Sequence, residues 1–132
     1  FILFSVTNKF LLYLLRKRDE MKKITLGEFE ELVLLTTGVL QDNAYGVTIK
    51  LELEQQLNKK ISLGALYAAL QRLEEKGWVS SRVGGITEKQ GGRRKQYYDI
   101  TKEGVIALNE VRNMRNEFFD RLLQAKIDWL SP

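Results

Sequence analysis

The chain has 132 residues, 44% of them hydrophobic, which suits one domain with a modest core and one accessory element. It contains no cysteine and no histidine, so disulfides and thiol chemistry are excluded, and the commonest general base and metal ligand are missing. Its net charge is +4, and the segment from Arg82 to Lys95, with five basic residues and one acid, accounts for all of it. We therefore expect a cytoplasmic binding protein with a local positive patch, no metal and no cofactor, and not an enzyme.

Residues 1–20 form an apolar extension that ends in a basic cluster. The run FILFSVTNKFLLYLL is shorter than a membrane span of about 20 residues, and its positive charges follow the apolar part, the reverse of a signal peptide. The first methionine is Met21. Three interpretations stay open: an upstream extension from start-site choice, an amphipathic helix that packs on a partner subunit, and a membrane anchor. We expect no membrane partner.

The next two predicted elements are helices. Thr25 and Glu28 fit the S/T-x-x-E capping box, and apolar residues at helical spacing then predict a helix that reaches about Leu40. Residues 41–43 are typical of a turn. A second helix is predicted from Tyr45 to Leu57, although its apolar residues fit the helical period imperfectly.

A third helix is predicted after Ser62, a good N-cap, and before Gly77, which has the position of a C-terminal glycine stop. Leu66, Leu70 and Leu73 form its core-facing stripe. The opposite face is small at its start and polar or aromatic further on, as suits a helix that approaches base edges in the major groove. For Tyr67, a place at the edge of the core is the alternative. The predicted DNA contacts of this recognition helix are Ser62, Gly64, Ala65, Tyr67, Ala68, Gln71 and Arg72.

Two short strands follow, over residues 78–83 and 95–100, and a glycine-rich tip joins them into a hairpin. Glycine lets the backbone approach phosphates closely, and lysine and arginine neutralise them. The predicted contacts of this wing are Lys89, Gly91, Gly92, Arg93, Arg94 and Lys95. Weaker candidates for contacts to the DNA backbone are Tyr45, Lys59 and Lys60. An ordinary solvated turn is the alternative for the basic run.

The last predicted helix follows Thr101 and runs from Lys102 to about Trp129. Its apolar residues recur at steps of 3 and 4, and such a surface must be covered by the chain's own domain or by a second copy. The predicted dimerisation residues are Leu108, Val111, Met114, Phe118, Leu122, Ala125 and Trp129. A possible effector pocket, for which ordinary core packing is the alternative, would be lined by Trp78, Phe118, Phe119 and Trp129.

The order of elements predicts a mainly α protein with a small β-hairpin (α+β). Three helices followed by a two-stranded wing form a winged helix-turn-helix, here with a long C-terminal dimerisation helix. We expect residues 1–20 to be an apolar extension, residues 21–101 a winged helix-turn-helix DNA-binding domain, and residues 102–132 the dimerisation helix.

Two stretches, SLGALYAALQRLEEKGWVSSR and GGRRKQYYDITKEG, resemble the PadR family of bacterial transcriptional regulators, as does the segment AYGVTI. The resemblance covers about Leu26 to Leu122. It implies a dimeric repressor on a pseudo-palindromic operator, the long C-terminal helix as the dimerisation element, and relief by a small aromatic or hydrophobic effector. The single C-terminal helix looks like the shorter branch of the family, whereas the apolar extension before Met21 departs from the family pattern.

Two other functions remain open, because a fold does not determine a function. The winged domain could bind a protein without specific DNA binding, or it could bind nucleic acid without sequence preference. A specific regulator prefers one duplex over random competitor, whereas a non-specific binder shows only strong salt dependence.

Overall fold

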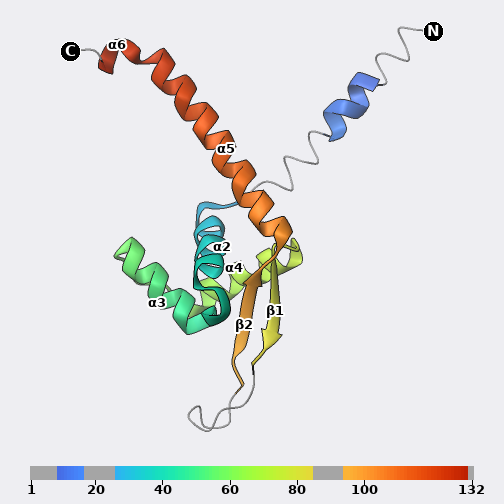
Figure 1. Cartoon of the computed structure of the whole chain (residues 1–132), viewed down its shortest axis with the longest axis vertical. Helices are drawn as coiled ribbons and strands as arrows, with labels where there is room; N and C mark the ends of the chain where they lie inside the picture. Colours follow the sequence, from blue (N-terminus) through green and yellow to red (C-terminus); the bar gives the residue numbers. More distant parts are fainter. Residues whose placement is uncertain (1–8, 17–25, 85–93, 131–132) are drawn as a thin grey trace.

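The structure is a computed structural model that describes residues 9–16, 26–84 and 94–130. Three helices form a bundle, a hairpin of two strands extends from one side of it, and the last long helix extends from the opposite side (Figure 1). The elements are α2 (Glu28–Leu40), the 3₁₀ turn η1 (Gln41–Asn43), α3 (Gly46–Leu57), α4 (Leu63–Glu75), β1 (Val79–Val83), β2 (Gln96–Ile100), α5 (Lys102–Ala125) and α6 (Ile127–Leu130). The predicted fold class is confirmed.

A further short helix covers residues 9–16, and all of its side chains are exposed. Among the helices of the described ranges, none is long and apolar enough to cross a membrane.

Helix α2 lies at the centre of the core, where it packs against α3, α4, β2 and α5. Leu34 of α2, Ile49 of α3 and the leucine stripe of α4 are fully buried in one hydrophobic cluster. On α3, Ile49 and Leu53 are buried one turn apart, whereas Val47 and Leu51 are exposed. The imperfect period of α3 is thereby explained, because only one face of this helix meets the core.

Both predicted ends of α4 are confirmed. The Ser62 hydroxyl accepts a hydrogen bond of 3.1 Å from the Ala65 N–H, and Gly77 adopts φ +78°. The N–H groups of Gly77 and Trp78 donate to the carbonyls of Glu74 and Leu73, both at 3.0 Å, which is the Schellman motif.

The capping box predicted for the first helix is wrong. Helix α2 begins at Glu28 with Gly27 as its N-cap, and the Gly27 position supplies no side-chain cap. Thr25, the other half of the predicted box, lies outside the described residues.

The hairpin is antiparallel, with Val79 opposite Ile100 and Val83 opposite Gln96. Its second strand is joined to the start of α3. The Tyr98 N–H donates to the Ala44 carbonyl at 2.8 Å, and Tyr45 and Tyr97 form an isolated β-bridge. Backbone pairing therefore joins the middle of β2 to the start of α3.

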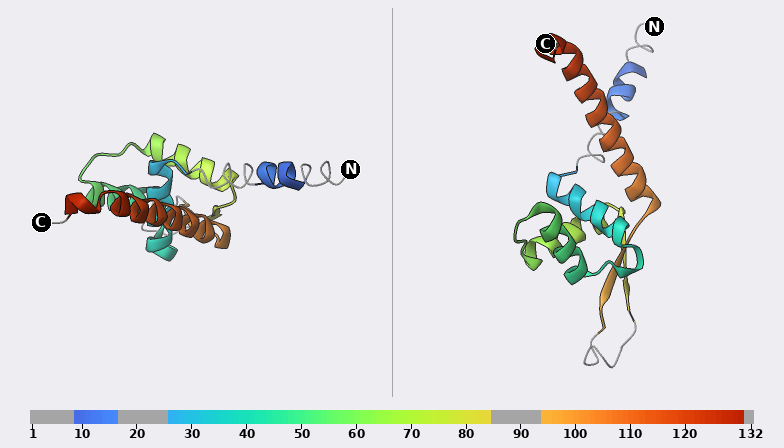
Figure 2. Two further views of the ribbon diagram at one scale, coloured as in Figure 1. Left: turned by 90° about the horizontal axis from the view of Figure 1, so that it is seen from above. Right: turned by 60° about the vertical axis from the view of Figure 1, so that its left-hand side comes forward.

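Helix α5 is anchored at its first turn. The Thr101 hydroxyl accepts from the Gly104 N–H at 3.0 Å and donates to the Gly77 carbonyl at 2.7 Å. Gly104, Ala107 and Val111 of its first turns are buried, whereas residues 112–125 are all exposed. Figure 2 shows this distal half of α5 projecting away from the bundle, on the side opposite the hairpin.

Two predictions about α5 need correction. The helix ends at Ala125 and not near Trp129, because the chain turns at Lys126, whose N–H bonds to the Leu122 and Leu123 carbonyls, before the four residues of α6. Val111, predicted as a dimer contact, is only 3% exposed, and Leu108 packs against the core of the winged unit. Both side chains are therefore at least partly covered within a single chain.

Candidate nucleic-acid interface

Helix α4 presents the outward face that its sequence predicts. Leu66, Ala69, Leu70 and Leu73 are fully buried, so the opposite side of the helix faces solvent. Six predicted contact residues are exposed there: Ser62, Gly64, Ala65, Tyr67, Ala68 and Gln71. The small residues lie in the first turn, where a recognition helix approaches base edges most closely.

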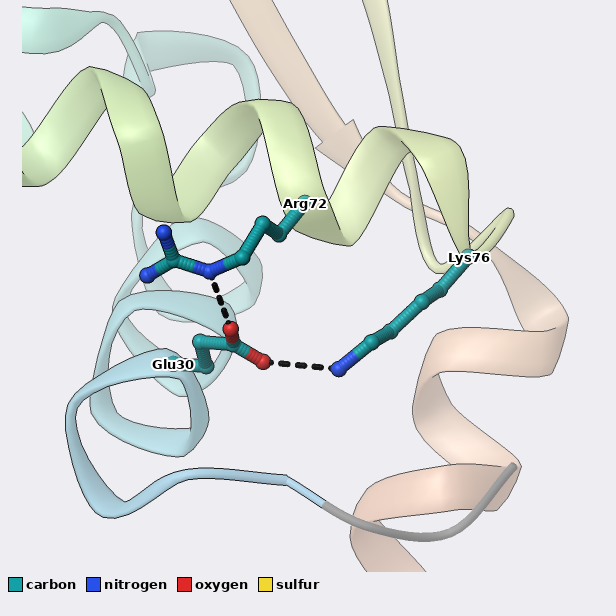
Figure 3. Close-up of polar contacts among 3 residues, drawn as sticks. All are labelled: Glu30, Arg72 and Lys76. Carbon is teal, nitrogen blue, oxygen red and sulfur yellow. Dashed lines mark hydrogen bonds and ion pairs between the residues drawn. The ribbon is translucent and has the colours of Figure 1, made fainter. Parts of the chain in front are cut away.

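Arg72 is also exposed, but it has a partner that the sequence does not predict. Its Nε donates to the carboxylate of Glu30 on α2 at 2.5 Å, and Nζ of Lys76 donates to the other oxygen of the same carboxylate at 2.9 Å (Figure 3). Burial raises the pKa of Glu30, but the hydrogen bonds and charges of Lys76 and Arg72 outweigh it, so the pKa lies below its ordinary 4.5. Glu30 therefore stays ionised and holds two cations of α4.

A hollow of about 590 Å³ lies between the start of α3, the outward face of α4 and residues 94–96, at the end of the hairpin next to its tip. Gly46 makes this arrangement possible, because a Cβ at that position would lie 2.1 Å from the Tyr67 hydroxyl oxygen. The Tyr67 ring thus leans over the start of α3, and 45% of the residue stays exposed. The lining residues are Tyr45, Gly46, Val47, Tyr67, Arg94, Lys95 and Gln96.

The electrostatics of this hollow favour an anion. It contains Arg94 and Lys95, and Nζ of Lys95 lies 4.1 Å from the ring centre of Tyr45. The N-terminus of α3 adds the positive end of a helix dipole, and the Tyr67 hydroxyl adds a donor. Arg82 of the same hairpin differs, because its Nε pairs with Asp99 at 3.1 Å.

The remaining predicted backbone contacts are less closely grouped. Lys59 and Lys60 are exposed in the connection between α3 and α4. This connection is fixed by Glu54, whose carboxylate accepts from the Ile61 N–H at 2.9 Å and from Lys50 at 3.0 Å. Four of the predicted wing contacts lie outside the described residues: Lys89, Gly91, Gly92 and Arg93.

The predicted dimerisation residues beyond Val111 are exposed along distal α5 and α6. Phe118 is 61% and Trp129 78% exposed, and Met114, Leu122 and Ala125 are exposed beside them. Three of the four aromatics of the predicted effector pocket, Phe118, Phe119 and Trp129, belong to this surface.

Trp78, the fourth aromatic of the predicted effector pocket, does not belong to the exposed surface of distal α5 and α6. It is 7% exposed beside Gly104, and Phe118 is 14 residues further along α5, a rise of about 21 Å. A single chain therefore does not bring the predicted effector pocket together.

Sequence reasoning missed two residues of this interface. Glu30 gives no local signal for its link to Arg72, because the two are 42 residues apart. Gly46 stands in the AYGVTI segment, but the sequence does not show that its missing side chain leaves room for Tyr67. Within the described ranges, no group of acidic side chains is placed to hold a metal ion.

Comparison with known proteins points to one family. The model of the family described as "Transcriptional regulator PadR-like family" matches residues 36–110. A search of curated proteins found no match.

Solved structures share the fold. A PadR-like transcription factor from Bacteroides fragilis is 22% identical, with a TM-score of 0.62 over 83% of this chain and 98% of its own. A PadR family transcriptional regulator from Eggerthella lenta is 24% identical, with a TM-score of 0.57 over 92% of each chain. A PadR-like transcriptional regulator from Bacillus cereus is 22% identical, with a TM-score of 0.56 over 73% of this chain and 91% of its own.

Proposed function

The chain belongs to the transcriptional regulator PadR-like family, and from that premise we propose that this DNA-binding transcriptional regulator is a repressor that binds a pseudo-palindromic operator as a homodimer. The observation that carries the proposal is the position of the anion-favouring hollow directly beside the outward face of α4. A helix in the major groove needs phosphate contacts close by to set its register. The hollow supplies them from α3, α4 and the wing.

In the proposed complex, the outward face of α4 enters the major groove. Gly64, Ala65 and Ala68 allow close approach, and Gln71 reads base edges by its amide. One backbone phosphate lies in the hollow, where Arg94, Lys95 and the Tyr67 hydroxyl bind it. The predicted contacts of the wing tip would reach the neighbouring backbone.

A second copy would cover the exposed stripe of distal α5. The stripe runs over residues 112–125, about 21 Å of helix, and its exposed Phe118 is typical of an interface core. A two-fold axis through this contact would place two α4 helices on half-sites about one DNA turn apart. Because α5 and the hairpin project to opposite sides of the bundle (Figure 1), such a dimer contact would leave the nucleic-acid interface open.

The proposal includes relief by a small aromatic or hydrophobic effector. A site that uses Phe118, Phe119 and Trp129 would form at the contact of two α5 helices. Operator-bound protein titrated with aromatic acids and amines should then release DNA, and a Trp129→Ala variant should not respond.

The first test is fluorescence anisotropy with the duplex upstream of the coding region, at two salt concentrations and with excess random duplex. The affinity of a specific regulator for that duplex should exceed its affinity for random sequence by about 10³-fold or more. Replacing Arg94 and Lys95 by Ala should weaken binding to all duplexes and lower the salt slope by about 2. Gln71→Ala should instead change which sequence is preferred.

The control for the wing variant is Lys102→Ala, which removes an exposed cation from the first turn of α5, outside the hollow and outside the proposed dimer contact. It should bind as the parent does. Equal binding by the double variant and the parent would refute the phosphate site, and loss of binding in Lys102→Ala would show that the effect is one of net charge. No binding of any duplex at low salt would favour the alternative, a winged-helix protein-interaction module.

The dimer has its own test. Phe118→Glu should convert a dimer into a monomer in analytical ultracentrifugation and weaken operator binding, because the two half-sites then act separately. A parent chain that sediments as a monomer at micromolar concentration would contradict the homodimer.

A further inference from the structure

Glu30 is an acidic residue on the core side of α2, in the immediate neighbourhood of the recognition helix. It is 8% exposed, and its two carboxylate oxygens are both engaged, one by Arg72 and one by Lys76 (Figure 3). The two cations lie one turn apart on the same flank of α4 and reach down to α2. The carboxylate is therefore a fixed anion, held in place by the helix that forms the centre of the core.

Arg72 and Lys76 stand at the edge of the outward face of α4, and their side chains are 50% and 34% exposed. Extended toward solvent, both could reach the phosphates that border the major groove. Such contacts would be the same on every sequence, because phosphate contacts carry no base information. Each added contact would strengthen binding to random DNA and steepen the slope of log K against log salt by about 0.9.

We propose that Glu30 limits the sequence-independent affinity of the protein for DNA, because it holds Arg72 and Lys76 against α2 and so keeps them off the DNA backbone. This inference rests on the proposed DNA binding by α4. Because phosphate contacts are alike on every duplex, restraint of the two cations lowers the affinity for operator and random DNA by the same factor and leaves the preference set by base contacts such as those of Gln71 unchanged.

The next residue of α2 provides a matched control. Glu31 has a side-chain exposure of 14% and pairs with Arg115 of α5 at 2.7 Å, away from α4. Glu31→Gln removes the same charge from the same helix turn, but the cation that it releases, Arg115, lies outside the nucleic-acid interface. A general effect of net charge would appear in both variants, whereas restraint of the α4 cations would appear only in Glu30→Gln.

The experiment measures the affinity of the full chain for a random-sequence duplex over a salt series. For Glu30→Gln we expect the slope of log K against log salt to steepen by about 1 to 2, and random-duplex affinity near 0.15 M salt to rise about fivefold to thirtyfold. The affinity for the operator should rise by the same factor, so that the preference for the operator stays unchanged. Glu31→Gln should match the parent, and adding Arg72→Ala and Lys76→Ala to Glu30→Gln should restore the parent slope.

A second pair of variants keeps the test independent of how well Glu30→Gln folds. With Glu30 in place, Arg72→Ala and Lys76→Ala should leave the salt slope unchanged, because neither cation touches a phosphate. A slope lowered by about 1 in either variant would show that the cation already contacts DNA and would overturn the inference. An unchanged slope in folded Glu30→Gln would do the same while the proposed function stands, and a parent that binds no duplex would overturn both proposals.

Discussion

Gly104 lies in the first turn of α5, where this helix crosses the start of the hairpin. A Cβ at Gly104 would lie 2.4 Å from the Trp78 carbonyl oxygen and 2.9 Å from Cγ1 of Ile100. The carbonyl is backbone, and it accepts the Thr101 N–H at 3.0 Å, so it cannot move without breaking the anchor of α5. We expect Gly104→Ala to lower the free energy of unfolding by about 1 to 3 kcal/mol, the range of overpacking, even after the helix preference of alanine is included.

Urea denaturation followed by circular dichroism measures this loss, and thermal unfolding should show a Tm lower by roughly 4 to 12 °C. The control is Gly64→Ala on α4, where nothing lies within 4 Å of the added Cβ. That variant should be neutral or more stable by up to about 1 kcal/mol, since alanine favours a helix. If Gly104→Ala is as stable as the parent, the close crossing of α5 over Trp78 is refuted. If both variants shift alike, helix preference and not the crossing determines the result.

Three further predictions concern the hollow, the core and pH. Gly46→Ala should displace the Tyr67 hydroxyl and weaken operator binding about tenfold with little change in Tm, because the displaced atom is the end of a half-exposed side chain; a parent-like Kd would refute the proposed phosphate contact. Leu66→Ala should cost about 2 to 5 kcal/mol in urea denaturation, since Leu66 is fully buried, and a loss below about 1 kcal/mol would contradict the described core. The lowered pKa of Glu30 stabilises the fold above pH 4.5, and this contribution is lost as pH falls through the lower folded pKa. Between these pH values the free energy of unfolding of the parent should therefore fall more steeply than that of Glu30→Gln. Parallel curves of stability against pH would show that Lys76 and Arg72 do not lower the pKa of Glu30.

The sequence by itself determined the local elements of this protein. Ser62 and Gly77 set the two ends of α4 because their signals act within a few residues, through one hydroxyl cap and one positive φ. The leucine stripe of α4 predicted which face of that helix is buried. The element order was enough to predict a winged helix-turn-helix, because it has few compact arrangements.

Tertiary structure alone decided what covers each apolar face and which charged side chains form ion pairs. Val111 and Phe118 continue one stripe of α5, yet Val111 is 3% and Phe118 61% exposed. Periodicity identifies an apolar face but not its partner. In the same way, Arg72 is predicted to face DNA from its helical position, and only the folding of α2 against α4 places Glu30 beside it, 42 residues away in sequence. Such contacts depend on how the helices pack, and no local signal encodes them.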